Sequence, residues 1–157
     1  MTHQIKRSLL LKSDINSVWD FTSNPYNLKK ITPDFMNFKI INTELSTKIY
    51  EGMILKYKVS PILKIPITWV TEITHVKEKI SFIDEQRFGP YKIWHHEHLF
   101  QEHEDGVKMK DIVTYVPPFH MIGKVVNTLY LTRKLNQIFD YRKMKINNFF
   151  NKKQTTL

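Results

Sequence analysis

The sequence predicts an α+β fold, in which a seven-stranded antiparallel sheet packs against one long C-terminal helix. Three observations lead to this prediction. The middle of the chain, residues 36–117, contains strand patterns without a helical one, short turn sequences separate these strands, and a helical apolar period occupies the C-terminal segment. Strands joined by short turns pair as antiparallel neighbours. A block of strands followed by a separate helix indicates an α+β arrangement.

The N-terminal segment is expected to contribute one strand and two short helices. Residues 5–12 alternate as a strand does. Asp14 is typical of a helix N-cap and precedes a helical pattern over residues 15–21. Pro25 then begins a second short helix over residues 26–31, and the sequence TP that follows ends it.

Six further strands are expected in the middle of the chain. Their ranges are 36–44, 51–60, 66–76, 79–88, 91–103 and 107–117. The sequences between them contain glycine, proline or charged turn residues, which favour tight connections.

The C-terminal segment predicts a helix. Apolar residues follow the helical period at positions 131, 135, 138, 139, 146, 149 and 150. An earlier apolar face, at positions 122, 125, 126 and 129, has a different phase. The change of phase predicts a kink or break near residues 130–133, with Thr132 as a possible N-cap. We expect a single domain over residues 1–150 and a basic polar tail over residues 151–157.

Composition excludes several classes of protein. The chain has 157 residues, no cysteine and four glycines. Disulfides, thiolate metal sites and cysteine nucleophiles are therefore excluded, and so are the glycine-rich loops that bind phosphate groups. No apolar run approaches the roughly 18 residues of a membrane span, and the N-terminus does not resemble a signal peptide. We therefore expect a cytoplasmic protein without stable membrane insertion and without a cofactor.

The net charge of +9 is concentrated at one end of the sequence. Residues 119–157 contain eight of the 24 Lys and Arg residues but only one of the 15 acidic residues. Such a segment could contact nucleic acid or an anionic membrane surface, or could be the solvated face of a terminal helix. The basic positions alternate with the apolar ones and no RNA-binding motif is present. We therefore expect no nucleic-acid partner, and the sequence leaves the oligomeric state open.

The inner face of the predicted sheet contains many polar residues. Lysines mark the outer face of several strands, so alternate residues point inward. For residues 91–103, the aromatic residues favour an inward set of Trp94, His96, His98 and Phe100 over the alternative set that contains Glu97. For residues 79–88 the residues expected to point inward are Ile80, Phe82, Asp84, Gln86 and Phe88. The polar inward residues are Thr71, Asp84, Gln86, His96, His98, Asp111 and Tyr115.

This polar face has two interpretations. The residues could satisfy one another in an internal network, for example with Asp84 or Asp111 accepting hydrogen bonds from His96 or His98. Alternatively, the sheet could curve around a cavity whose polar and aromatic groups contact a ligand. We favour the cavity, because a dry core rarely contains so many polar groups. Residues 60–66, with apolar residues between two prolines, are then expected to form a loop at its mouth.

Three segments resemble those of a known superfamily. They are residues 82–100 (FIDEQRFGPYKIWHHEHLF), residues 105–117 (DGVKMKDIVTYVP) and residues 135–142 (LNQIFDYR). They resemble the SRPBCC (START-like, Bet v 1-like) ligand-binding superfamily, most closely its bacterial cyclase/dehydrase-like branch. The resemblance implies a helix-grip fold, in which a curved antiparallel sheet surrounds a long C-terminal helix with a cavity between them. It implies no catalytic set, because members differ widely in function.

The leading hypothesis is therefore a protein that binds a small hydrophobic or amphipathic molecule between the sheet and the helix. The alternative is a polyketide cyclase or dehydratase-like enzyme that uses histidine and aspartate groups of the same pocket for acid–base chemistry. A metal site of His96, His98 and Asp111 has suitable ligand types, but we expect no metal. The candidate ligand-binding residues are Tyr57, Trp69, Thr71, Asp84, Gln86, Trp94, His96, His98, Met109, Asp111 and Tyr115.

Overall fold

The computed structural model describes residues 1–60, 65–117 and 124–151, with the side chains of the last segment from residue 129 onward. The strands are β1 (His3–Leu11), β2 (Lys39–Ile40), β3 (Ile54–Val59), β4 (Ile67–Lys77), β5 (Ser81–Phe88), β6 (Ile93–His103) and β7 (Gly106–Val116). The helices are α1 (Ile15–Thr22), the short 3-10 helices η1 (Pro25–Ile31) and η2 (Asp34–Met36), and α2 (Lys124–Asn151).

All seven strands form one antiparallel sheet in the order β1-β7-β6-β5-β4-β3-β2. The first strand therefore pairs with the last, with His3 opposite Tyr115. The register shifts twice between β4 and β5. Such bulges bend the paired strands and strengthen their twist. The predicted seven-stranded antiparallel sheet is confirmed.

Local hydrogen bonds explain where the two predicted short helices begin. The Asp14 carboxylate accepts hydrogen bonds from the Ser17 backbone N–H (3.0 Å) and hydroxyl (2.6 Å), as an N-cap does. The Asn24 side chain accepts a hydrogen bond from the Tyr26 N–H (3.0 Å), and Pro25 occupies the first turn of η1. Both helices are confirmed, the second as a 3-10 helix.

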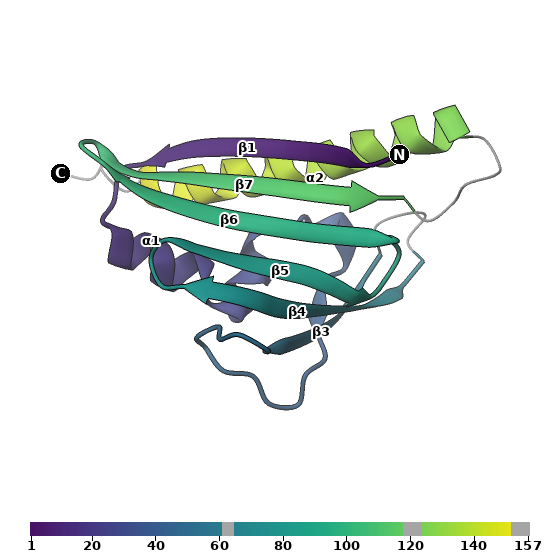
Figure 1. Ribbon diagram of the computed structural model, residues 1–157, viewed down its shortest axis with the longest axis horizontal. Helices are drawn as coiled ribbons and strands as arrows, with labels where there is room; N and C mark the ends of the chain where they lie inside the picture. The colour runs from purple at the N-terminus through teal and green to yellow at the C-terminus, as the bar shows by residue number, and fades with distance from the viewer. Residues whose placement is uncertain (61–64, 118–123, 152–157) are drawn as a thin grey trace.

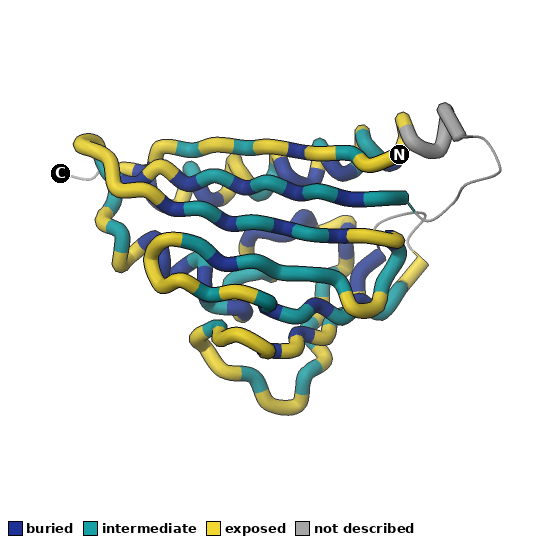
Figure 2. The backbone as a smooth tube through the Cα atoms, in the orientation of Figure 1, coloured by how far each residue is buried: buried dark blue, intermediate teal, exposed yellow. Residues whose placement is uncertain are grey.

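The helices pack on one face of the sheet. Figure 1 shows α2 behind β1 and β7, and α2 also contacts η1. Along β6 and β7, buried residues alternate with more exposed ones, as Figure 2 shows. The buried side chains of these strands meet Leu135, Ile138 and Phe139 of α2 in one hydrophobic cluster. The core therefore lies between the sheet and the long helix.

The inward orientation predicted for β6 is confirmed. Trp94, His96, His98 and Phe100 are all buried. The ring of Phe139 on α2 lies 6.3 Å from that of Trp94 and 5.5 Å from that of His96.

Two strand predictions are wrong in detail. Residues 36–44 do not form a long strand, because η2 occupies the start of this range and only Lys39–Ile40 pairs with β3. Ile80 and Phe88 are exposed rather than inward. Ile80 belongs to the turn before β5. At the other end of β5 a bulge adds Arg87 between the paired positions, which turns Phe88 to the outer face opposite Val70.

The predicted break in the C-terminal helix is also wrong. Helix α2 is continuous across residues 130–133. Leu129 and Tyr130 are exposed and Leu131 is buried, so the helix passes here from exposed to buried surroundings while it remains continuous. Thr132 does not cap a helix; its hydroxyl forms a hydrogen bond with the Tyr115 hydroxyl (3.0 Å).

Two expectations fall partly outside the described residues. These are the loop at the cavity mouth, of which residues 61–64 are not described, and the tail, of which residues 152–157 are not described. Asn151, assigned to the tail, is instead the last residue of α2 and donates a hydrogen bond to the Leu10 carbonyl (3.1 Å). None of the described helices has the length and apolar character that a membrane crossing requires.

Candidate functional site: a cavity between the sheet and α2

A cavity of about 120 Å³ lies between the sheet, η1 and α2. A cavity needs roughly 10–15 Å³ of such space to hold one water molecule, so this cavity has room for about ten water molecules. Strands β3 to β7 supply one wall. Leu28 and Ile31 of η1 and Leu135 and Ile138 of α2 supply the opposite side. Most of the lining is apolar, which is typical of a small-molecule site.

Aromatic rings form one end of the cavity. Trp69 and Trp94 meet edge to face with ring centroids 5.1 Å apart, and Tyr91 lies 4.9 Å from Trp94. Tyr57 stacks against Trp69 at 6.0 Å. These mutual contacts hold the ring orientations, so the aromatic wall presents both ring faces and ring edges.

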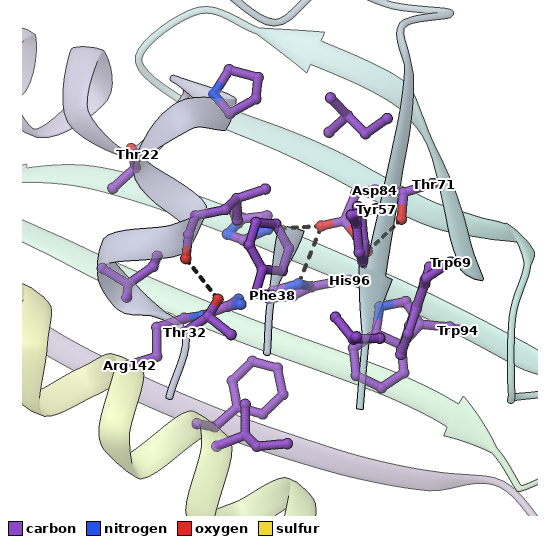
Figure 3. A pocket seen from close by; sticks show the side chains of 18 of the residues that line it. Thr22, Thr32, Phe38, Tyr57, Trp69, Thr71, Asp84, Trp94, His96 and Arg142 are labelled. Atoms are coloured by element: carbon purple, nitrogen blue, oxygen red, sulfur yellow. Dashed lines mark hydrogen bonds and ion pairs between the residues drawn. The ribbon is translucent and has the colours of Figure 1, made fainter. Parts of the chain in front are cut away.

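Four buried ionisable side chains form a closed network beside this wall. His96 Nδ1 lies 3.1 Å from Asp84 Oδ2, and His96 Nε2 lies 3.5 Å from Asp111 Oδ1. His98 has the same two neighbours: its Nε2 lies 3.0 Å from Asp84 Oδ2 and its Nδ1 lies 2.9 Å from Asp111 Oδ1. We call Asp84, His96, His98 and Asp111 the quartet. Figure 3 shows Asp84 and His96 together at the centre of the cavity.

The quartet fixes the charge state of its members. Burial raises the pKa of Asp84, but the attraction and hydrogen bonds of His96 and His98 outweigh burial, so this pKa lies below its usual range. The pKa of Asp111 is likewise lowered, because both imidazoles outweigh its burial. Burial lowers the pKa of His96, and the two carboxylates outweigh it, so this pKa is raised. Ionised carboxylates and a protonated His96 therefore stabilise one another.

The quartet is also the part of the cavity where a metal ion could be held. Asp84, His96 and His98 offer ligand atoms that lie within 4.8 Å of one another. A metal bound there would have to displace the protons that His96 presents to its two carboxylates. Because the two carboxylates already contact the imidazoles at ion-pair distance, we assign these contacts to ion pairs.

Within the quartet, His96 Nε2, His98 Nδ1 and Asp111 Oδ1 lie at ion-pair distance but lack hydrogen-bond geometry. Other polar groups of the lining also lack partners. The hydroxyls of Tyr57 and Thr71 are hydrogen-bonded to each other at 2.8 Å, which leaves one hydroxyl hydrogen free to donate. The Trp69 Nε1–H and the Arg142 Nε–H are buried without a hydrogen-bond partner. Each of these groups can donate a hydrogen bond to a molecule in the cavity.

Eight of the eleven candidate residues line the cavity. They are Tyr57, Trp69, Thr71, Asp84, Trp94, His96, His98 and Met109. Three do not line it. Gln86 instead exchanges hydrogen bonds with the Tyr91 backbone (2.6 and 3.2 Å), Asp111 supports the two histidines from behind, and Tyr115 binds Thr132.

Arg142 lines the cavity but is missing from the candidate set. It lies between Phe139 and Ile146, at a position where the apolar stripe of the helix is interrupted. That interruption is the signal in the sequence, since a basic residue within an inward stripe is costly unless it has a purpose. The lining contributed by η1 has no comparable signal.

No protein-family model and no curated protein matches the sequence. Several solved structures are similar in fold. Protein NE0264 from Nitrosomonas europaea has a TM-score of 0.67 at 13% identity, covering 99% of this chain and 97% of its own. The di-domain ARO/CYC BexL from the BE-7585A biosynthetic pathway has a TM-score of 0.70 at 12% identity, covering 96% of this chain and 50% of its own.

The structure of Ara h 8.0201 has a TM-score of 0.59 at 13% identity, covering 93% of this chain and 98% of its own. At these identities the similarity concerns the fold alone. The chain therefore has a helix-grip fold, which it shares with these structures.

Proposed function

We propose that this protein binds a small hydrophobic or amphipathic molecule in the cavity between the sheet and α2. The observation that carries the proposal is a cavity of about 120 Å³ with an aromatic wall. A core evolved for stability alone is close-packed. Retaining such a space, lined by hydrogen-bond donors without partners, is costly unless a ligand fills it.

Filling the cavity tests the proposal. The probe is 2-naphthamide, a flat neutral molecule, and its affinity is measured by calorimetry. Ile138 is buried on α2 and lines the cavity, so Ile138→Trp is expected to weaken binding about tenfold or more while the protein remains folded. Met144→Trp, on the exposed side of the same helix, is the matched control and should bind as the unmodified protein does.

Leu135→Phe adds less volume than Ile138→Trp does, and it repeats the test if the tryptophan is too large for the cavity. Equal binding by the unmodified protein and by both cavity-filling variants would place the probe elsewhere and contradict the proposal. Failure of 2-naphthamide to bind the unmodified protein would contradict it as well.

The alternative is a cyclase or dehydratase-like enzyme, because three members of the quartet line the cavity. General acid–base catalysis requires a group that can reach the substrate. Both ring nitrogens of His96 and of His98 face carboxylates, which favours binding over catalysis. The enzyme hypothesis predicts dehydration of a β-hydroxyketone by the unmodified protein and not by His96→Gln. Equal rates for the two proteins would reject it.

A further inference from the structure

Arg142 occupies an unusual position on α2. The residues one turn before and after it, Ile138, Phe139 and Ile146, are buried against the sheet. Arg142 lies on the same stripe and lines the cavity. In Figure 3 its side chain extends from α2 toward the interior of the cavity. The helix therefore places a permanent positive charge at an inward position.

Among the residues that the structure describes, no side chain or carbonyl accepts a hydrogen bond from Arg142. Its Nε has almost no exposed surface and no hydrogen-bond partner. None of the ion pairs within residues 1–60, 65–117 and 129–151 includes it. Its one described contact of this kind is with the ring of Phe139, whose centroid lies 5.2 Å from the guanidinium carbon. The ring holds the guanidinium in place by a cation–π contact but accepts no N–H hydrogen bond in its plane.

The carboxylate in the cavity lining that could act as a counter-ion for Arg142 already has ion-pair partners. Asp84 is the one carboxylate of the described cavity lining, and two histidines contact its Oδ2. The other free polar groups, Trp69 Nε1 and the hydroxyl pair of Tyr57 and Thr71, are donors. The cavity thus presents several hydrogen-bond donors and one unpaired cation. Arg142 is half-buried and its Nε is enclosed without an acceptor, so the partner that suits this guanidinium from within the cavity is an anion.

We propose that the ligand is a small amphipathic anion whose carboxylate pairs with Arg142 while its apolar body lies against the aromatic wall. This inference rests on the proposed function, and it adds the chemical class of the ligand. An arginine suits this role because its planar donor group matches the two oxygens of a carboxylate. A second acceptor on the ligand would meet Trp69 Nε1.

One other role for Arg142 has to be distinguished. The guanidinium could act at a distance as a counter-charge to the carboxylates of the quartet. In that case its removal would lower the free energy of unfolding and would not change the choice between ligands. If Arg142 is kept for an anion, its removal takes away a half-buried charge without a partner, and the unfolding free energy stays the same or rises.

A pair of probes of the same shape separates these possibilities. They are 2-naphthoate, which is ionised at pH 7, and neutral 2-naphthamide. Calorimetry should show that the unmodified protein binds naphthoate about tenfold or more tightly than naphthamide, as expected for a charged hydrogen bond. Arg142→Gln should abolish this preference. Arg142→Lys should retain part of it. Lys143→Gln, an equal loss of charge at an exposed neighbour, should retain all of it.

The outcomes are distinct. Binding of naphthamide without preference for naphthoate would overturn this inference and leave the proposed function intact. A preference that survives in Arg142→Gln would also overturn it, because another group would then hold the anion. Binding of neither probe would overturn both proposals. Urea unfolding of the same variants decides the counter-charge role, since a loss of stability with an unchanged preference would assign Arg142 to the quartet.

Discussion

His96 has a carboxylate oxygen next to each of its two ring nitrogens. A neutral imidazole has only one N–H, so this arrangement favours the doubly protonated ring. The side chains that face it are His98 on its own strand, Asp84 and Asp111 on the strands to either side, and Phe139 on α2. The charge of the imidazolium is thus balanced within the sheet, and the quartet is a buried ion network.

The network predicts a large effect of Asp111→Asn, which preserves shape and removes charge. Asp111 is 6% exposed, and its loss leaves buried imidazole groups without a counter-ion. We expect the free energy of unfolding to fall by about 3 kcal/mol or more, measured by urea denaturation. Asp140→Asn is the control, because Asp140 forms an exposed pair with Arg7 (2.8 Å) and should cost about 1 kcal/mol or less. Equal effects of the two substitutions would contradict the network.

The stability of the protein should depend on pH in two directions. The pKa of His96 is raised, so its contribution is complete below about 6.5, the unfolded value, and is lost as pH rises through the folded pKa. The pKa values of Asp84 and Asp111 are lowered, so their contributions are present above about 3.9 and are lost as pH falls below it. Unfolding free energies across pH 3–9 should therefore be highest between these limits. His96→Gln should flatten the alkaline decline, and an unaltered decline would assign it to other groups.

At this scale the sequence predicted the orientation of the polar side chains better than their roles. Strict alternation placed His96 and His98 inward, because a strand has a period of two. It could not indicate that Gln86 folds back onto the Tyr91 backbone, since that contact depends on how the turn at Gly89 closes. Arg142 was missed because a helical stripe identifies apolar positions, and a charged residue within it reads as a gap.

Helix α2 is attached to the sheet by a specific hydrogen bond as well as by apolar packing. The Tyr115 hydroxyl on β7 bonds to the Thr132 hydroxyl on α2 at 3.0 Å, and Tyr115 is fully buried. The Asn136 side-chain oxygen on α2 also accepts a hydrogen bond from Arg7 on β1 (2.7 Å). These contacts fix the helix along its axis, which pure apolar packing does less well.

This hydrogen bond can be tested with a double-mutant cycle. Thr132→Val leaves the buried Tyr115 hydroxyl without a partner and should cost about 1 kcal/mol or more of unfolding free energy. Tyr115→Phe together with Thr132→Val removes both groups and should cost less than the sum of the single changes. Additive costs would show that the two hydroxyls do not interact.

The elements were predictable where local chemistry determines them. Asp14 and Pro25 marked the starts of α1 and η1, because capping and proline geometry act over a few residues. The break expected near residue 130 did not occur, since a helix can leave the sheet surface without bending. Residues 36–44 failed as a strand because η2 takes the start of the range, a preference that alternation alone does not reveal.

At the scale of the whole molecule, the cavity follows from the way the sheet and α2 meet. Bulges bend β4 and β5, while α2 packs mainly along β1, which is an edge strand of the sheet. The helix therefore covers one part of the inner face closely, and the strands β3 to β7 border the remaining space with η1. The predicted seven-stranded sheet with its long helix allowed the presence of a cavity between them to be predicted. The size of the cavity could not be predicted, because it depends on side-chain packing.

The three tryptophans allow the most direct test of ligand binding. Trp69 and Trp94 line the cavity, whereas Trp19 does not line it and packs against Phe82 and Phe100. Each indole N–H gives its own signal in a nitrogen–proton correlation spectrum. During titration with 2-naphthamide, we expect the Trp69 and Trp94 signals to shift to saturation while the Trp19 signal stays nearly constant. Unchanged Trp69 and Trp94 signals, or a shift confined to Trp19, would contradict binding in this cavity.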